Sequence, residues 1–441
     1  MTLSFGTDGV RGPAPEKLNT RFVTCLAKAA AEILSADRWI IGRDTRESGL
    51  LLSEAIISAV TNDGFIAIDT GVVPTPVVAY LSNIENSGGV VVSASHNPWT
   101  DNGIKIFAPG GRKLRDQEQA LIEKRLNELL ADTEITAQHN SDPTQHANPT
   151  EAWINSICTA LENRTLEGTH LVVDCANGSA SRIAEPLFRE LGARVDIINN
   201  EPDGRNINQG CGSTNPQMLV ETVQTSGADL GLALDGDADR LIAVASDGAI
   251  IDGDRQLCLF ATDLDQREQL INRSVVITVM SNLGLRQALQ RADITTIEVP
   301  VGDRNILTRL DAGEAILGGE QSGHLIFRQH GTTGDGLLSG ALLADLILRS
   351  EKNSAELIHD AMHQFPQVLL NIAVNSKSVE MPEDIQQEIE LTQERLADTG
   401  RVLVRVSGTE ALIRVMVEAT EETLAQSEAQ RLASIIQAGI S

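Results

Sequence analysis

Short apolar runs rich in β-branched residues alternate with stretches of helical periodicity along most of this 441-residue chain. The first such unit joins an amphipathic stretch over 22–34 to apolar runs at 39–41 and 65–68, with a further helical stretch over 53–60. Strands that alternate with helices in this way predict an α/β fold. A chain of this length exceeds one ordinary hydrophobic core, so three or four domains are expected.

Similar α/β runs recur further along the chain, and its last part differs in character. A second run begins at 170–174 and includes strands at 195–198 and 230–234. After residue 354 the pattern changes to two strands and a final helix, and the segment 72–76 is predicted as an extended loop. The remaining predicted elements are strands at 89–92, 103–107, 275–280, 296–299, 315–317, 402–406 and 412–417, and helices at 219–225, 283–290, 337–348 and 421–438.

The net charge of −26 limits the kinds of partner that the chain can have. A field of this sign repels nucleic acids and anionic membranes, so neither is an expected partner. A small anionic substrate remains compatible, because local basic groups can reverse the field inside a cleft. Aromatic residues make up only 3% of the chain, so any sugar recognition would depend on hydrogen bonds.

The cysteine content favours a reducing, cytoplasmic setting. The five cysteines are widely spaced, contain no Cys-x-x-Cys pair and predict neither a disulfide framework nor a zinc site. The beginning of the sequence has no basic region followed by an apolar stretch, so no signal peptide is expected. No apolar run approaches the roughly 18 residues of a membrane span.

The stretch SASHNP at 93–98 follows the apolar run 89–92 and precedes turn-forming residues. We therefore expect Ser95 on a loop at the end of a strand, with His96 beside it. A serine hydroxyl is a weak nucleophile unless it is activated or already modified. On this stretch alone, a loop serine that hydrogen-bonds its own backbone is an equally good interpretation.

The stretch DGDADR at 235–240 places Asp235, Asp237 and Asp239 at alternate positions of a turn that follows a predicted strand. Three carboxylates so arranged can converge on one hard cation. An EF-hand is excluded because its sixth and twelfth positions are Arg240 and Ser246, not glycine and glutamate. Magnesium suits carboxylates plus a phosphate oxygen, whereas an acidic turn without an ion is costly.

Two further stretches carry polar groups on glycine-rich backbone. GTDGVRG at 6–12 surrounds Arg11 with glycines that allow close approach to a ligand, although a plain turn is the alternative. GGEQSGH at 318–324 presents Glu320, Ser322 and His324 and could bind sugar hydroxyls, or be a hydrogen-bonded turn. Lys105, ten positions after Ser95, could point back to the serine loop or be a solvated strand lysine.

The last motif is SGTE at 407–410. Backbone N–H groups and hydroxyls in such a turn form a concave anion site. Arg405 and Arg414 flank the turn and could clamp a phosphate with forked hydrogen bonds. The predicted phosphate-binding residues are Arg405, Ser407, Gly408, Thr409 and Arg414.

Taken in order, SASHNP, DGDADR, GEQSGH and SGTE resemble the four active-site motifs of the α-D-phosphohexomutase superfamily. The resemblance covers nearly the whole chain. Within the superfamily, FGTDGVRG, GGEQSGH and the following TTGDG look like the bacterial phosphoglucosamine mutase branch, with phosphomannomutase/phosphoglucomutase as the near neighbour. Two departures occur in the phosphate loop, where the family usually has Lys at Val406 and Pro at Ala411.

The resemblance implies an α/β fold of four domains around a central cleft, three of them similar mixed α/β units and the fourth a smaller α+β domain. The expected domains are 1–150 with the phosphoserine loop, 151–254 with the metal loop, 255–365 with the sugar loop and 366–441 with the phosphate loop.

The resemblance also implies a reaction. Ser95 would be phosphorylated and would exchange phosphate with glucosamine 6-phosphate through a 1,6-bisphosphate, giving glucosamine 1-phosphate for UDP-N-acetylglucosamine and cell-wall precursor synthesis. One Mg²⁺ per subunit would be held by Ser95, Asp235, Asp237 and Asp239, with glucosamine or glucose 1,6-bisphosphate as activator. The other residues expected at the reacting centre are His96, Arg11, Lys105, Arg240 and His324, with Glu320 and Ser322 on the sugar.

Phosphoryl transfer needs alignment and neutralisation of charge, which this set of residues could supply. The sequence leaves open which residue is the general base, with Lys105 and His324 as candidates, and whether a homodimer forms. Two other classes of protein stay open as well: a non-catalytic regulator that binds phosphosugar and metal, and a phosphatase that hydrolyses the phosphoserine.

Overall fold

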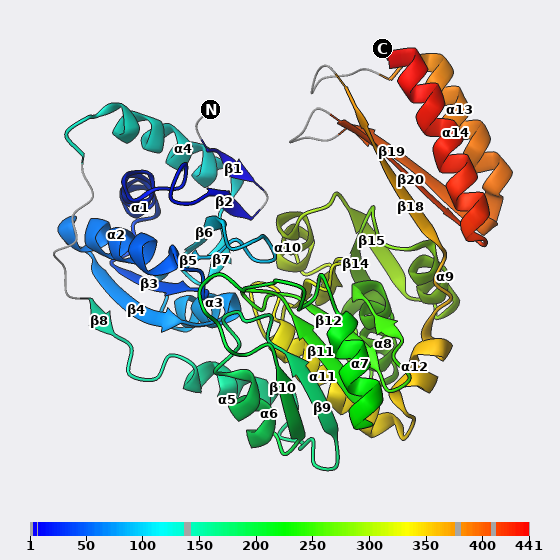
Figure 1. Cartoon of the computed structure of the whole chain (residues 1–441), viewed down its shortest axis with the longest axis horizontal. Helices are drawn as coiled ribbons and strands as arrows, with labels where there is room; N and C mark the ends of the chain where they lie inside the picture. Colours follow the sequence, from blue (N-terminus) through cyan, green and yellow to red (C-terminus); the bar gives the residue numbers. More distant parts are fainter. Residues whose placement is uncertain (1–2, 7, 136–142, 375–380, 407–411, 441) are drawn as a thin grey trace. The chain divides into compact units, whose positions relative to one another are not determined.

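The chain forms two compact units, shown as a ribbon in Figure 1. The structure is a computed structural model that describes residues 3–6, 8–135, 143–374, 381–406 and 412–440. The first unit comprises residues 1–280 and 293–360, and the second comprises 281–292 and 361–441. Each unit is described by itself below.

The first sheet of the first unit has the order β1-β2-β6-β5-β3-β4-β8, with β7 paired to β6. Its centre is parallel: β3 lies between β4 and β5, and β6 then runs antiparallel to β5. The strands are β1 (Phe5–Gly6), β2 (Gly9–Pro13), β3 (Arg38–Arg43), β4 (Ile66–Val72), β5 (Gly88–Val92), β6 (Asp101–Ala108), β7 (Arg112–Lys113) and β8 (Thr144–Gln145).

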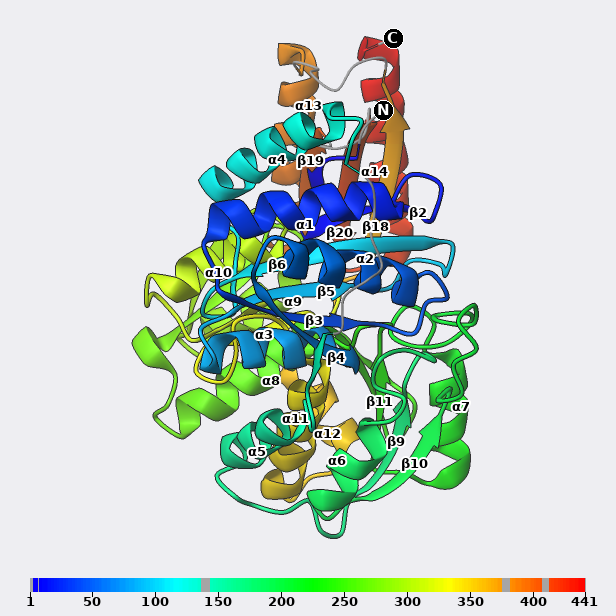
Figure 2. The same ribbon diagram turned by 90° about the vertical axis from the view of Figure 1, so that its left-hand side faces the viewer.

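Helices cover both faces of this sheet. Helices α1 (Thr20–Leu34), α2 (Gly49–Asn62) and α4 (Asp116–Ala131) contribute to one apolar core with strands β3, β5 and β6. Figure 2 shows α1 and α4 on one side of the sheet and α3 (Thr75–Ile84) on the other. The expected extended loop over 72–76 is wrong from residue 75 onward, because α3 begins there. A proline in the first helical turn, here Pro76, loses no helical hydrogen bond.

The second sheet has the order β10-β9-β11-β12-β13. Strands β9 (His170–Asp174), β10 (Arg194–Ile198) and β11 (Leu230–Leu234) are parallel, and β12 (Leu241–Ala245) returns antiparallel to β11. Strand β13 (Ile250–Ile251) completes the edge. The strands predicted at 170–174 and 230–234 are confirmed at these bounds. The helices of this part are α5 (Glu151–Ala160), α6 (Ala184–Glu190) and α7 (Gln217–Ser226).

The third sheet has the order β15-β14-β16-β17. Strand β14 (Ser274–Thr278) pairs in parallel with β15 (Thr295–Val299) and with β16 (Leu317–Gly319), and β17 (Leu325–Phe327) is antiparallel to β16. The strand predicted at 315–317 begins only at Leu317. The helices of this part are α8 (Gly253–Gln266), α10 (Asp303–Asp311), α11 (Gly336–Ser350) and α12 (Ser354–Ala361).

The three sheets share one plan, which confirms the expectation of three similar α/β units. In each, three parallel strands are followed by a fourth that returns antiparallel beside the third: β4-β3-β5-β6, β10-β9-β11-β12 and β15-β14-β16-β17. The loop between the third and fourth strands carries the serine stretch in the first sheet, the three aspartates in the second and Glu320 to His324 in the third. Ligands of open α/β sheets bind outside the carboxyl ends of the parallel strands, which is where these loops lie.

The second unit is a three-stranded antiparallel sheet with helices, the smaller α+β domain that was expected. Its strand order is β18-β20-β19, and the apolar face of α14 packs on the sheet through Ala425, Ala429 and Leu432. Strand β18 and helix α13 were not predicted from the sequence. The elements are α9 (Leu283–Arg291), β18 (Gln367–Ala373), α13 (Glu383–Leu396), β19 (Gly400–Val406), β20 (Leu412–Ala419) and α14 (Glu422–Ile440). No helix within the described residues has the length and apolar character to cross a membrane.

Candidate functional site

Ser95 lies on the loop after β5, as predicted, and is buried. Its backbone has φ +54°, a left-handed conformation that non-glycine residues rarely adopt. The hydroxyl Oγ donates to Oδ2 of Asp235 at 2.5 Å and lies 3.2 Å from Nδ1 of His96. We call the segment 93–100 between β5 and β6 the serine loop, and the segment 235–240 between β11 and β12 the aspartate loop. The backbones of the two loops are in close contact, since a Cβ at Gly236 would lie 2.6 Å from the carbonyl oxygen of Ser95.

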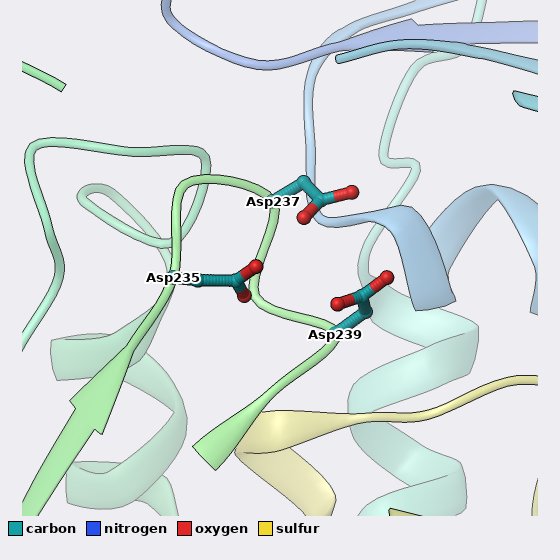
Figure 3. Close-up of side chains that lie close together, drawn as sticks. All are labelled: Asp235, Asp237 and Asp239. Carbon is teal, nitrogen blue, oxygen red and sulfur yellow. The ribbon is translucent and has the colours of Figure 1, made fainter. Parts of the chain in front are cut away.

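The carboxylates of Asp235, Asp237 and Asp239 turn toward a common space (Figure 3) and offer ligand atoms within 4.8 Å of one another. All three are buried, and Oδ1 of both Asp237 and Asp239 has no hydrogen-bond partner in the described part of the chain. Burial, together with the charges of Asp239 and Asp237, raises the pKa of Asp235 to about 7. Buried carboxylate oxygens without donors are acceptors that a cation would satisfy, so the cluster fits a metal site.

Lys105 is buried among the same carboxylates. Its ammonium Nζ lies 2.7 Å from Asp237, 2.6 Å from Asp239 and 2.8 Å from Asp8. Although burial alone would lower the pKa of Lys105, these carboxylates hold it well above its usual value. Lys105 therefore carries a positive charge at the aspartate cluster and is not a solvated strand lysine. Of the two alternatives left open by the sequence, neither is matched in full, because the side chain reaches the aspartate loop.

Two residues without an obvious signal in the sequence, Thr75 and Lys113, contact these charged side chains. Thr75, the first residue of α3, donates its hydroxyl to Oδ2 of Asp237 at 2.5 Å, and its backbone N–H donates to the carbonyl oxygen of Asp237 at 3.0 Å. Lys113 forms ion pairs with Asp8 and, at 3.0 Å, with Asp303. Asp8 lies within GTDGVRG and Asp303 begins α10, and each stands next to a glycine. These two aspartates were the signal in the sequence that could have pointed to Lys113 as their partner.

A cavity of about 380 Å³ opens beside the serine and aspartate loops. This volume lies within the range of small-molecule sites. The predicted residues Arg11, His96, Arg240, Glu320 and His324 all line it. The other lining residues are Ser4, Gly6, Asp8, Gly9, Asp239, Val301, Gly302 and Asp303.

The cavity wall combines cations with a neutral imidazole. Arg11 pairs with Asp8 at 3.1 Å, and the guanidinium Nε of Arg240 lies 3.9 Å from Asp239. Burial and the charges of Arg240 and Arg11 lower the pKa of His96 to about 4, so this imidazole is neutral at pH 7. Arg11 and Arg240 are the groups of the wall that can pair with an anionic ligand, and carboxylates line other parts of it.

The loop between β16 and β17 supplies the third wall of the cavity. Glu320 accepts the backbone N–H of Gly302 at 2.9 Å, and the Oγ of Ser322 lies 3.5 Å from Glu320. His324 is buried, with Nδ1 3.5 Å from Asp239, and its Nε2 accepts the backbone N–H of Gly334 at 3.2 Å. The cavity is thus bordered by Glu320 and His324, while Ser322 is not among the residues that line it.

The predicted phosphate loop belongs to the second unit, and its tip, Ser407, Gly408 and Thr409, lies outside the described residues. Arg405 on β19 and Arg414 on β20 are described and are direct partners in the register of the two strands. Burial and the facing Arg414 lower the pKa of Arg405. Like charges placed opposite each other destabilise a sheet, and an anion between them would relieve the repulsion.

Four family models match the chain one after another. They describe the alpha/beta/alpha domains I, II and III of phosphoglucomutase/phosphomannomutase, over residues 2–132, 150–248 and 252–365, and the C-terminal domain over 369–435. The chain belongs to the phosphoglucomutase/phosphomannomutase family. The resemblance noted in the sequence is thereby confirmed for the family.

Individual members of this phosphohexomutase family agree with that assignment. A phosphoglucosamine mutase of Thermobifida fusca is 46% identical over 99% of this chain and 98% of its own length. A phosphoglucomutase/phosphomannomutase family protein of Burkholderia thailandensis has the same fold, with a TM-score of 0.80 at 24% identity over 99% of this chain and 98% of its own. The N-acetylphosphoglucosamine mutase of Aspergillus fumigatus, solved with GlcNAc-6P and magnesium, has a TM-score of 0.72 at 18% identity, covering 100% and 96% of the two chains.

Proposed function

We propose that this phosphohexomutase is a phosphoglucosamine mutase, which interconverts glucosamine 6-phosphate and glucosamine 1-phosphate through a phosphoserine at Ser95. The observation that carries the proposal is the Ser95 hydroxyl, 2.5 Å from a buried aspartate of a cluster that fits a metal ion. The 46% identity to a phosphoglucosamine mutase over nearly the full length of both chains supports the choice of sugar. The product would serve UDP-N-acetylglucosamine and cell-wall precursor synthesis.

The reaction consists of two phosphoryl transfers. In the first, the 1-hydroxyl oxygen of glucosamine 6-phosphate bonds to the phosphorus on Ser95 and the phosphorus–Oγ bond breaks. The sugar hydroxyl proton leaves to a base, and Oγ takes up a proton. This yields glucosamine 1,6-bisphosphate and a serine hydroxyl. In the second, Oγ loses its proton and bonds to the phosphorus of the 6-phosphate, the bond from that phosphorus to the 6-oxygen breaks, and the 6-oxygen takes up a proton. Glucosamine 1-phosphate then leaves and the phosphoserine is restored.

The residues around Ser95 would align these groups and neutralise their charge, which is most of what phosphoryl transfer requires. Arg11 and Arg240 line the cavity and are placed to pair with phosphate oxygens. Lys105, held as a cation, would act through its charge, which leaves His324 as the better candidate for proton transfer. His96 is uncharged at pH 7 and would hydrogen-bond Oγ or the phosphate.

One Mg²⁺ per subunit would be held by Asp235, Asp237 and Asp239 together with an oxygen on Ser95. When bound, the ion supplies a Lewis acid that draws negative charge from the transferring phosphoryl group. The orphaned carboxylate oxygens of Asp237 and Asp239 support this assignment. Glucosamine or glucose 1,6-bisphosphate would act as activator by phosphorylating Ser95.

We assign recognition of the remainder of the substrate to two sets of residues. Glu320 and Ser322 would accept and donate hydrogen bonds to sugar hydroxyls. The facing Arg405 and Arg414, with Ser407, Gly408 and Thr409, would hold the phosphate that is not transferred, and the like charges on neighbouring strands support an anion there.

The direct test is an assay of glucosamine 6-phosphate with Mg²⁺ and a trace of glucose 1,6-bisphosphate, for wild type and Ser95→Ala. We expect glucosamine 1-phosphate from the wild type and none above background from the variant. Ser87→Ala is the matched control, because Ser87 is equally buried and its hydroxyl has no hydrogen-bond partner among the described residues. Undiminished turnover by Ser95→Ala would refute the proposal.

Other functions give different results in the same assay. A phosphomannomutase/phosphoglucomutase would show a higher kcat/KM on mannose or glucose phosphates than on glucosamine phosphate. A phosphatase would release inorganic phosphate in step with substrate loss, and a non-catalytic regulator would bind phosphosugar without turnover. The serine and aspartate loops meeting at one cavity favour a mutase over the regulator.

We further propose domain limits of 1–150, 151–254, 255–365 and 366–441 and a cytoplasmic location, and a homodimer stays an open alternative. Small phosphosugars are the expected partners, with no nucleic acid and no membrane. The net charge of −26 supports the exclusion of anionic polymers. Sedimentation velocity of the purified chain would test the dimer.

A further inference from the structure

A buried ion pair lies directly against the serine loop. Arg46 and Asp44 follow strand β3, and both side chains are fully shielded from solvent. The guanidinium Nε donates to Oδ2 of Asp44 at 2.8 Å, and the backbone N–H of Arg46 donates to Oδ1 of Asp44 at 3.0 Å.

Every remaining N–H of the Arg46 guanidinium is directed to the backbone of the serine loop or of Asp101. Nη2 donates to the carbonyl oxygens of Ser95 at 2.9 Å and Asn97 at 2.8 Å. Nη1 donates to the carbonyl oxygen of Asp101 at 3.0 Å and to that of Pro98. An arginine has five N–H donors in a rigid planar fork, and this side chain uses all of them, three on the serine loop and one on Asp101, the first residue of β6.

Asp44 holds the backbone N–H of Ser95 through the hydroxyl of Ser93. Its Oδ2 accepts the hydroxyl of Ser93 at 2.6 Å, and the Oγ of Ser93 accepts the backbone N–H of Ser95 at 2.9 Å. The N–H of Ser95 is thus tied to Asp44 through Ser93, and its C=O is tied to Arg46. Asn208 adds a second donor to the same carbonyl oxygen at 2.9 Å, from the loop that precedes α7.

This double hold explains why Ser95 can keep a backbone conformation with φ +54°. Such a conformation persists in a non-glycine residue only where the surroundings enforce it. If the hold loosens, Ser95 relaxes toward an ordinary conformation, and its Oγ leaves the position 2.5 Å from Asp235. Displacements of about 1 Å at a reacting group can cost about 100-fold in rate.

We propose that Arg46, together with Asp44, is the positioning residue that fixes the phosphoryl-carrying side chain of Ser95 against the aspartate cluster. The inference deepens the proposed function and rests on it. Arg46 contacts neither the cavity nor the cluster in the described residues, so its effect is on the placement of Ser95 and not on affinity for the sugar.

The test is Arg46→Lys, in which a single ammonium replaces the five-donor fork. We expect kcat for glucosamine 6-phosphate to fall about 10- to 100-fold while KM changes less than about threefold. The rate of Ser95 phosphorylation by glucose 1,6-bisphosphate should fall by the same factor. The rise in melting temperature that Mg²⁺ produces should be retained, because the three aspartates keep their contacts.

Arg164→Lys is the matched control. Arg164 also forms a forked pair with a buried carboxylate, Asp345, through two bonds of 2.8 Å, and it makes no contact with the serine loop. We expect Arg164→Lys to lower the melting temperature without changing kcat. If Arg46→Lys does not fold, Ser93→Ala decides, because it cuts the link to the Ser95 N–H and should lower kcat at nearly constant KM.

The inference would be overturned by wild-type kcat in a folded Arg46→Lys protein, or by wild-type kcat in Ser93→Ala when Arg46→Lys does not fold. A loss expressed in KM alone would also contradict it. Ser95→Ala separates this inference from the proposed function. Activity in Ser95→Ala would refute the mutase itself, whereas an inactive Ser95→Ala beside a fully active Arg46→Lys would refute only the role of Arg46.

Discussion

Replacing Lys105 by methionine removes an ammonium group that three carboxylates share. Nζ lies within 2.8 Å of Asp8, Asp237 and Asp239, and the side chains of Asp237 and Asp239 are 0% and 2% exposed. Methionine keeps the length of the stem and fills the same space. Breaking a buried ion pair by removing one partner costs about 3–5 kcal/mol, so we expect the free energy of unfolding to fall by that amount in metal-free protein.

Mg²⁺ should restore more stability to this variant than it adds to the wild type. A cation on the aspartate cluster replaces the missing positive charge, and in the variant no ammonium competes with it. A ligand that binds only the folded state stabilises it by RT ln(1 + [L]/Kd), so tighter binding appears as a larger shift. Urea denaturation in EDTA and in Mg²⁺, followed by tryptophan fluorescence, measures both effects. The three tryptophans, Trp39, Trp99 and Trp153, all belong to the first unit, which contains the cluster.

Lys28→Met is the control for loss of a lysine charge. Lys28 pairs with Asp63 at the surface, where the two side chains are 22% and 26% exposed. Exposed pairs contribute about 0–1 kcal/mol, so this variant should be almost as stable as the wild type. The reasoning fails if Lys105→Met loses no more stability than Lys28→Met, or if Mg²⁺ stabilises Lys105→Met and wild type equally.

Two further predictions concern single hydrogen-bonded groups. Thr75→Val removes the hydroxyl that donates to Asp237 at 2.5 Å and should lower the free energy of unfolding in EDTA by about 1–3 kcal/mol, whereas Thr75→Ser, which keeps a hydroxyl, should lower it less. Equal melting temperatures for the two variants would contradict this role of the hydroxyl. Asp335 accepts the indole N–H of Trp153 at 2.8 Å, and burial raises its pKa to about 6 from 3.8. Because folding raises the pKa of Asp335, its protonated carboxyl stabilises the folded state by about 3 kcal/mol below pH 3.8, and this stabilisation is lost as the pH rises through 6. Asp335→Asn should therefore flatten the dependence of the unfolding free energy on pH over this range. An unchanged slope in urea titrations would contradict the raised pKa of Asp335.

The parts of the site that could be predicted are those formed within one short stretch. Asp235, Asp237 and Asp239 converge because alternate residues of one turn are neighbours whatever surrounds them. Ser95 could be placed at the end of its strand because the run 89–92 is apolar and the following residues are turn formers. In both cases the residue types within one short stretch were enough to predict where the side chains lie.

Contacts between distant parts of the chain could not be predicted in this way. The position of Lys105 depends on the register of β5 and β6, in which it is paired with Val91. The facing of Arg405 and Arg414 likewise follows from the register of β19 and β20. The contacts of Arg46 depend on β3 and β5 being neighbours in the sheet, an arrangement that no local pattern specifies.

The helix α3 shows how local signals can also mislead. Pro74 and Pro76 bracket its first residue, and prolines at this spacing favour extended backbone when they are read without context. In the structure they lie at the start of the helix, where the missing N–H groups are not needed. The consequence for the site is direct, because the first residue of this helix, Thr75, donates to Asp237.

The central claim is that Ser95 carries the transferred phosphoryl group while the aspartate cluster beside it holds Mg²⁺. The measurement is the incorporation of ³²P from glucose 1,6-bisphosphate into purified protein, with the label located by peptide mapping, for wild type, Ser95→Ala and Asp237→Asn. We predict one labelled peptide, containing Ser95, in the wild type with Mg²⁺, no label in Ser95→Ala, and much slower labelling in Asp237→Asn or in EDTA. Equal labelling of Ser95→Ala, or label on a peptide without Ser95, would contradict the account.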